Sequence, residues 1–297
     1  MAEDWLAAVT EDARRRRREF NQILRDNPVT DTSKTRAVQA ALVKETERRF
    51  KSVQDEVIAD IRARNYRYRL SPAGIDDAMD SYMRAYKRNV EETSVRGVTS
   101  TTGRPWTTRF VLKSIVIGAR EGRPWRRLEF ETALAGDLLG SDVRRTTLTA
   151  ALVNGRIFNG MDGIGQAERS MLNAILSEAS FQGSGIEKIE AAIKAQFDWM
   201  PKWRAHRIAR TEMIYARNLS YLQSTKDIEI AGKPLKYVWI AAYDARRTHA
   251  ARRNRIFSAE QVQALIGEPN CRCTSRAISP NDKRYDSQEE SIDRFLH

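Results

Sequence analysis

The chain has 297 residues, of which 41% are apolar and 30% charged, and it carries a formal net charge of +12 at pH 7. This balance is typical of a folded globular protein and argues against a disordered or membrane protein. No apolar run approaches the roughly 20 residues that cross a bilayer, so we expect no membrane-spanning segment and no membrane among the partners. The length allows about two domains.

The positive charge is concentrated toward the two ends of the chain. Residues 1–70 contain 16 basic and 12 acidic residues, and residues 201–297 contain 18 basic and 11 acidic residues. A surplus of this kind favours contact with polyanions, of which nucleic acid is the commonest. It indicates proximity to DNA or RNA without indicating a specific site.

A run of five arginines near the start has two interpretations. Consecutive helical residues point around the whole helix, so the run does not form one stripe facing a groove. Nearby Glu11, Asp12 and Glu19 can pair with it, as on a solvated helix surface. The alternative is nonspecific contact with phosphates by Arg14, Arg15, Arg16, Arg17 and Arg18.

Most of the first two hundred residues have a helical pattern. Apolar positions recur at helical spacing over residues 33–65. Ser71 followed by Pro72 is typical of the N-cap and first turn of a further helix. Residues 98–105 are rich in Thr, Ser and Gly and indicate a loop, whereas 110–117 fits either a strand or a buried helix.

Glycines divide the middle of the chain. Five of them lie between residues 122 and 160, which predicts short helices joined by turns. Two further helices are expected at about 166–179 and 184–197, the second opened by a capping box between Ser184 and Glu187.

A third helix, predicted from residue 203 to about 226, carries polar side chains that its core does not need. Glu212 falls in the middle of an apolar stripe, so its carboxylate requires a partner such as an arginine or a histidine. Thr211 and Asn218 lie on a neighbouring face and are placed to bond an adjoining loop. This helix therefore holds something in place.

Two more polar clusters follow at wide spacing. A turn at Gly232 and Pro234 precedes a strand at 237–242, and Asp244, Arg246 and His249 then fall within one turn or helix start. Cys271 and Cys273 come before a second expected strand near 272–278. Two cysteines one residue apart would form a strained disulfide, so reduced thiols are expected.

These clusters identify a family resemblance over about ninety residues. Their order and spacing resemble the phage Mu F-like family of tailed-phage minor head proteins, which act in head morphogenesis. The family usually has a glycine five residues after the histidine, where this chain has Asn254; because Asn tolerates the left-handed conformation, we expect the turn to survive. The residues that carry the resemblance are Arg210, Thr211, Glu212, Asn218, Trp239, Asp244, Arg246, His249, Pro269, Cys271, Arg272 and Cys273.

The resemblance implies a minor capsid protein. It does not exclude an enzyme, but no complete catalytic motif is visible in the sequence, so a structural role is favoured over catalysis. The resemblance also implies a virion location inside the phage head, with the host cytoplasm as the place of assembly. The implied partners are the portal protein and the capsid shell, with packaged DNA contacted nonspecifically. Its implied task is to aid head assembly, DNA packaging or DNA delivery.

Three interpretations of the polar clusters stay open. In the first they form a structural clamp of Arg210, Thr211, Glu212, Asn218, Asp244, Arg246, His249, Cys271 and Cys273, with no cofactor. In the second, His249, Cys271 and Cys273 bind zinc, although Cys-x-Cys is a weaker motif than Cys-x₂₋₄-Cys. In the third, His249, Glu212 and Arg246 serve a nuclease-like enzyme.

The fold class expected is mainly α with a small C-terminal α+β domain. Long N-terminal helices in residues 1–160 would form a region for assembly contacts and possible self-association. Residues 161–280 would form the α+β domain, with a short antiparallel sheet near the C-terminus. Residues 281–297 would form a polar tail in which Ile292, Phe295 and Leu296 dock on a partner.

Overall fold

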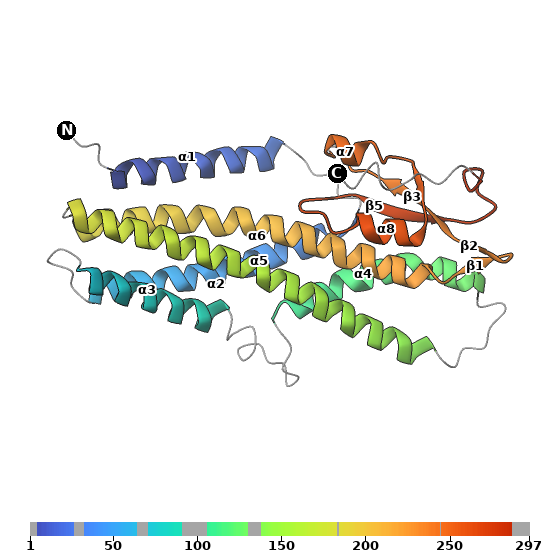
Figure 1. Cartoon of the computed structure of the whole chain (residues 1–297), viewed down its shortest axis with the longest axis horizontal. Helices are drawn as coiled ribbons and strands as arrows, with labels where there is room; N and C mark the ends of the chain where they lie inside the picture. The colour runs from blue at the N-terminus through green and yellow to red at the C-terminus, as the bar shows by residue number, and fades with distance from the viewer. Residues whose placement is uncertain are drawn as a thin grey trace. The chain divides into compact units, whose positions relative to one another are not determined.

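The computed structural model confirms a mainly helical fold with two small antiparallel sheets near the C-terminus (Figure 1). It describes residues 5–26, 33–63, 71–90, 106–129, 138–182, 184–243 and 245–286. The elements are α1 (Trp5–Asp26), α2 (Arg36–Ala63), α3 (Pro72–Tyr86), α4 (Thr108–Glu129), α5 (Leu138–Gln182), α6 (Ile186–Thr225), β1 (Glu229–Ile230), β2 (Lys233–Pro234), β3 (Lys236–Ile240), α7 (Arg247–Ala250), β4 (Ile256–Phe257), α8 (Ala259–Leu265) and β5 (Thr274–Ile278).

The chain forms two compact units, each assembled from three separate stretches. The first unit contains residues 1–28, 42–106 and 158–206, and the second contains 29–41, 107–157 and 207–297. Both α5 and α6 contribute to each unit. We predicted a different, linear division into an assembly region, an α+β domain and a tail, with boundaries after residues 160 and 280. That assignment of roles to the three segments stays a prediction.

Aromatic side chains build the core of the first unit. Tyr82 of α3 is fully buried and packs edge-on against Phe197 of α6. Tyr86, one helical turn later, packs on Phe50 of α2. As predicted, Ser71 caps α3: its side chain accepts a hydrogen bond from the Gly74 amide, and Pro72 occupies the first turn.

One carboxyl group in this core is fully buried. Glu168 of α5 lies 3.1 Å from the Tyr82 hydroxyl, which also donates to the Gly165 carbonyl at 2.9 Å. Burial raises the pKa of Glu168 well above its usual value, and the Tyr82 hydrogen bond opposes only part of the rise. The single Tyr82 proton has two acceptors, the Gly165 carbonyl and Glu168 Oε2. When that proton goes to Gly165, a neutral Glu168 can donate to the Tyr82 oxygen, while its Oε1 is buried without a hydrogen-bond partner among the described residues.

We expect Glu168→Gln to stabilise the protein increasingly as pH rises. A carboxyl whose folded pKa is raised contributes its full stability below its unfolded pKa and loses it as pH rises through the folded value. Glutamine stays neutral, so the gain should reach roughly 1–3 kcal/mol under alkaline conditions. Urea unfolding at pH 5 and pH 9 measures it, with the exposed Glu187→Gln as control. An equal effect at both pH values would contradict the assignment.

The glycine-rich middle of the chain corrects one prediction. Instead of short helices with turns over 123–160, followed by a separate helix, α5 runs unbroken from Leu138 to Gln182. Glycine costs a helix about 1 kcal/mol relative to alanine, which tertiary packing can outweigh. Gly165 leaves no space for a side chain, because a Cβ there would lie 2.6 Å from the Tyr86 ring.

A second correction concerns α6, which we predicted as two helices with a break near residue 200. The structure has one helix of 40 residues with Pro201 inside it. It begins at Ile186 rather than at the predicted Ser184 cap. Pro201 is buried, and the burial of neighbouring turns, including Phe197 and Ala205, offsets the local cost of the proline.

In the second unit, the C-terminal part of α6 packs against a three-stranded sheet. The strand order is β4-β3-β5, with both pairings antiparallel. The predicted strands at 237–242 and 272–278 correspond to β3 and β5, which Figure 1 shows side by side beside α8. Fully buried Trp239 is at the centre of this core and packs edge-on against Phe257.

The helix before the sheet and the turn after α7 settle two open points. Residues 110–117, which fitted either a strand or a helix, belong to α4. Gly118 of this helix approaches α6 closely, since a Cβ there would lie 2.1 Å from the Arg217 carbonyl oxygen. Asn254 has a φ of 62°, so it adopts the left-handed conformation expected in place of glycine.

One residue in the described part of the predicted tail, Tyr285, packs against the sheet. Tyr285 is buried beside Val238 and Ile256, and its hydroxyl donates to the Pro234 carbonyl at 2.5 Å. Ile292, Phe295 and Leu296 lie outside the described residues. No helix in the described part of the chain is long and apolar enough to span a membrane.

Candidate functional site

The loop 266–273 is held along one side by residues of α6. Thr211 accepts a hydrogen bond from the Asn270 amide at 2.9 Å, and the Asn218 side chain donates to the Cys273 carbonyl at 2.9 Å. These two residues are seven apart, so they present side chains on nearly the same helix face. As the sequence suggested, this face of the helix bonds an adjoining loop.

Arg156 of α5 supplies the partner that Glu212 requires. Its guanidinium donates to both carboxylate oxygens of Glu212, at 2.7 and 3.1 Å, and to the Gly267 carbonyl at 3.1 Å. Burial raises the pKa of Glu212, and Arg156 opposes only part of the rise. The arginine side chain is 38% exposed and the glutamate 9%, so the carboxylate carries more of the desolvation cost.

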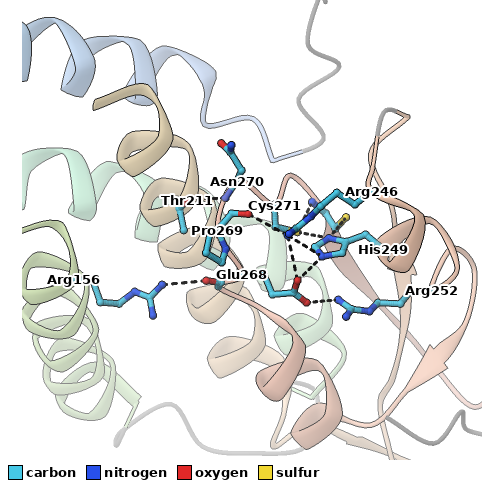
Figure 2. A network of polar contacts seen from close by, with 11 residues as sticks. Arg156, Thr211, Arg246, His249, Arg252, Glu268, Pro269, Asn270 and Cys271 are labelled. Carbon is cyan, nitrogen blue, oxygen red and sulfur yellow. Dashed lines mark hydrogen bonds and ion pairs between the residues drawn. The ribbon is translucent and has the colours of Figure 1, made fainter. Parts of the chain in front are cut away.

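Glu268 is the centre of a second polar network (Figure 2). His249 of α7 contacts it through Nε2 at 2.5 Å, and Arg252 donates to its other oxygen at 2.6 Å. Arg246 lies 3.3 Å from the same carboxylate and donates to the Pro269 carbonyl at 3.2 Å. Burial alone would raise the pKa of Glu268, but hydrogen bonds from Arg252 and His249 hold it below its usual value.

The ionised Glu268 fixes the state of the His249 ring. A carboxylate only accepts hydrogen bonds, so Nε2 carries the ring hydrogen and donates it. Nδ1 then presents its lone pair in the opposite direction. The Cys271 sulfur lies 3.2 Å from Nδ1 and the Cys273 sulfur 3.7 Å from it.

Both cysteines are free thiols and both are buried, as the sequence predicted for a reduced pair. The Cys273 amide donates to the Cys271 sulfur at 3.3 Å. A hydrogen bond from the Cys271 thiol lowers the pKa of Cys273, and the same bond raises that of Cys271. The two thiols and His249 therefore form one buried cluster.

A hollow of about 390 Å³ opens beside this cluster, and His249, Cys271 and Cys273 line it. Arg207, Arg210 and Arg272 also line it, so its walls are strongly basic. Asp244, which we predicted as a member of the polar clamp, lies outside the described residues.

The structure thus brings many of the predicted site residues to one loop, though not all by direct contact. Thr211, Asn218, His249, Cys271 and Cys273 hold or form the segment 266–273. Glu212 reaches it only through Arg156, and its two oxygens bond that arginine rather than His249. The nuclease interpretation, which placed Glu212 with His249, stays a hypothesis.

The arginines of α1 are paired with acidic side chains. Arg15 and Arg16 contact Asp12 at 2.5 and 2.7 Å, and Arg18 contacts Glu11 at 2.8 Å. Arg17 contacts Asp198 of α6 at 3.2 Å, while Arg14 lies 3.8 Å from Glu11. These contacts agree with a solvated helix, and phosphate contact by this run stays a prediction.

Sequence reasoning missed Arg156, Arg252 and Glu268. Arg252 is almost fully buried, and its guanidinium lies 5.6 Å from the centre of the Trp239 ring. Glu268 lies between Gly267 and Pro269, and this order already indicates a turn in the sequence. The structure agrees, because Gly267 has a φ of 90°. An acidic residue in a turn beside two cysteines was the available signal.

Comparison with known proteins gives a family match for about a third of the chain. Residues 171–276 match the model of a family described as Phage Mu protein F like protein. This confirms the resemblance drawn from the sequence. No curated protein and no solved structure gave a match to the chain.

Proposed function

We propose, on the premise that residues 171–276 belong to the Phage Mu protein F like family, that this chain is a minor capsid protein bound at or near the portal inside the head. The family itself indicates a phage head-morphogenesis protein and a virion location. The finer role is to aid head assembly, DNA packaging or DNA delivery. The family match is the observation that carries this proposal.

Two properties of the molecule support the role. The net charge of +12 favours contact with the phosphates of densely packed DNA. Such nonspecific contact does not require recognition of bases. The helices of the first unit, among them α1 and α2, provide surfaces long enough to contact the portal protein, the shell or a second copy.

Loss of the gene tests the role directly. Heads assembled without this chain are expected to be fewer or to contain less DNA, and supply of the wild-type chain should restore both. Electron microscopy counts the heads, and the DNA protected from nuclease measures packaging. Normal numbers of infectious, DNA-filled heads in its absence would contradict the proposal.

Association with the portal is a separate test. The tagged full chain is expected to retain the portal protein when both are produced together without other phage proteins. Repeating the capture at raised salt separates a specific interface from attraction between opposite charges, because exposed charge pairs weaken with salt. Capture that disappears completely at moderate salt would contradict a specific portal site.

A further inference from the structure

We propose that His249, Cys271 and Cys273 bind one zinc ion. Their candidate ligand atoms, the imidazole nitrogen and two sulfurs, all lie within 4.8 Å of one another, and all three residues are buried. Imidazole and thiolate are the ligand types that zinc prefers. The proposal is independent of the role in head assembly.

The distances suit a tetrahedral ion. Zinc bonds of about 2.3 Å to sulfur and about 2.0 Å to nitrogen place neighbouring ligand atoms about 3.5–3.8 Å apart. The two sulfur distances from His249 Nδ1 are 3.2 and 3.7 Å, within a few tenths of an ångström of the nitrogen–sulfur value. On binding, each thiol gives its proton to solvent and the sulfur donates an electron pair to the metal.

The surroundings of His249 match those of a metal-bound histidine. Zinc-ligating histidines usually donate their second ring N–H to a carboxylate, which fixes the ring and its tautomer. Here Nε2 donates to Glu268 at 2.5 Å, and buried Arg252 fixes that carboxylate from the other side at 2.6 Å. The lone pair of Nδ1 therefore already faces the two thiols, whose sulfurs lie 3.2 and 3.7 Å away.

The cysteine loop is held from its own side. Thr211 and Asn218 bond the backbone at Asn270 and Cys273, and the Cys273 amide donates to the Cys271 sulfur. An N–H donor of this kind stabilises a thiolate. The adjacent hollow of about 390 Å³ leaves room for a solvent molecule as fourth ligand.

Metal analysis of the purified full chain tests the site. After incubation with zinc chloride and dialysis against metal-free buffer, about one zinc per chain should remain. Chelation should then lower the melting temperature. Substoichiometric zinc together with unchanged melting after chelation would overturn the proposal.

Variants place the metal on these residues. Cys271→Ser with Cys273→Ser, or His249→Gln, should abolish retention, whereas His206→Gln, outside the cluster, should retain zinc like the wild type. Glu268→Gln should weaken zinc affinity about 10- to 100-fold while leaving the three ligands in place. Full retention by the double cysteine variant would overturn the assignment.

Cobalt provides a measurement that does not depend on variants folding. The wild-type chain titrated with Co²⁺ should develop the intense visible bands of tetrahedral cobalt and a near-ultraviolet band from thiolate ligands. Zinc should displace both bands. Absence of these bands in the folded wild type would overturn the proposal, whatever the variants do.

Discussion

Replacing Arg156 by methionine should destabilise the second unit by about 3 kcal/mol at neutral pH, because the buried Glu212 carboxylate loses its cation. Methionine preserves much of the arginine's packing over the Tyr215 ring, where the guanidinium lies 4.5 Å from the ring centre. The loss should grow as pH rises, since the raised pKa of Glu212 makes its ionisation increasingly costly in the folded state. Urea unfolding monitored by circular dichroism measures it.

A double-mutant cycle separates the ion pair from other effects of the substitution. Glu212→Gln in the Arg156→Met background removes the unpaired charge and should recover a large part of the lost stability. Arg247→Met, an exposed arginine on α7, is the matched control and should change stability by about 0.5 kcal/mol or less. If Arg156→Met lowers the free energy of unfolding no more than Arg247→Met does, Arg156 does not stabilise the buried Glu212 carboxylate.

Trp239→Ala is expected to cost about 3–5 kcal/mol, the usual range for truncating a large aromatic residue in a core. Trp239 is fully buried at the centre of the β4-β3-β5 sheet, and buried Arg252 lies over its ring. Since Arg252 also fixes Glu268, the vacancy should loosen the contact between His249 and the cysteine loop. Thermal unfolding gives the stability change.

The Trp239→Phe variant provides the comparison for this position. Phenylalanine keeps the edge-on packing against Phe257 and should cost less than half as much as alanine. Accessibility of Cys271 and Cys273 to a thiol reagent should increase more in the alanine variant than in the phenylalanine variant. Equal thiol accessibility in both variants would contradict the prediction that packing around Trp239 holds the cysteine cluster in place.

Local rules predicted several elements because the responsible physics acts within a few residues. Ser71 and Pro72 start α3 as their capping chemistry requires. Asn254, which the family resemblance placed where a glycine is usual, adopts the expected left-handed conformation. The strand around Trp239 was also predicted, although Tyr237, Val238 and Trp239 are all buried and do not alternate between core and solvent. In each case the deciding contacts lie within one turn or one strand.

The misjudged elements depended on distant contacts. Glycines in α5 suggested turns, but their helix cost is only about 1 kcal/mol each, and Gly165 is needed where the Tyr86 ring packs. The break predicted near residue 200 is likewise absent, because burial on both sides of Pro201 keeps α6 continuous. Propensity alone could not weigh these tertiary contributions.

The candidate site was predictable in part for the same reason. The sequence required a partner for Glu212 but could not choose among 51 basic side chains. Arg156 lies 56 positions away on another helix, and nothing in its local pattern distinguishes it. Glu268 is nearer in sequence to the residue that it contacts, 19 positions after His249. Its role still depends on the sheet and α7, which bring the His249 side chain to it.

Cross-linking of purified, DNA-filled heads followed by mass spectrometry tests whether the chain lies beside the portal inside the head. We expect the chain to be present in these heads and its exposed lysines to cross-link to the portal protein. The heads should be treated intact, so that contacts formed after disruption are not counted. Absence of the chain from mature heads, or cross-links to tail proteins alone, would contradict the account.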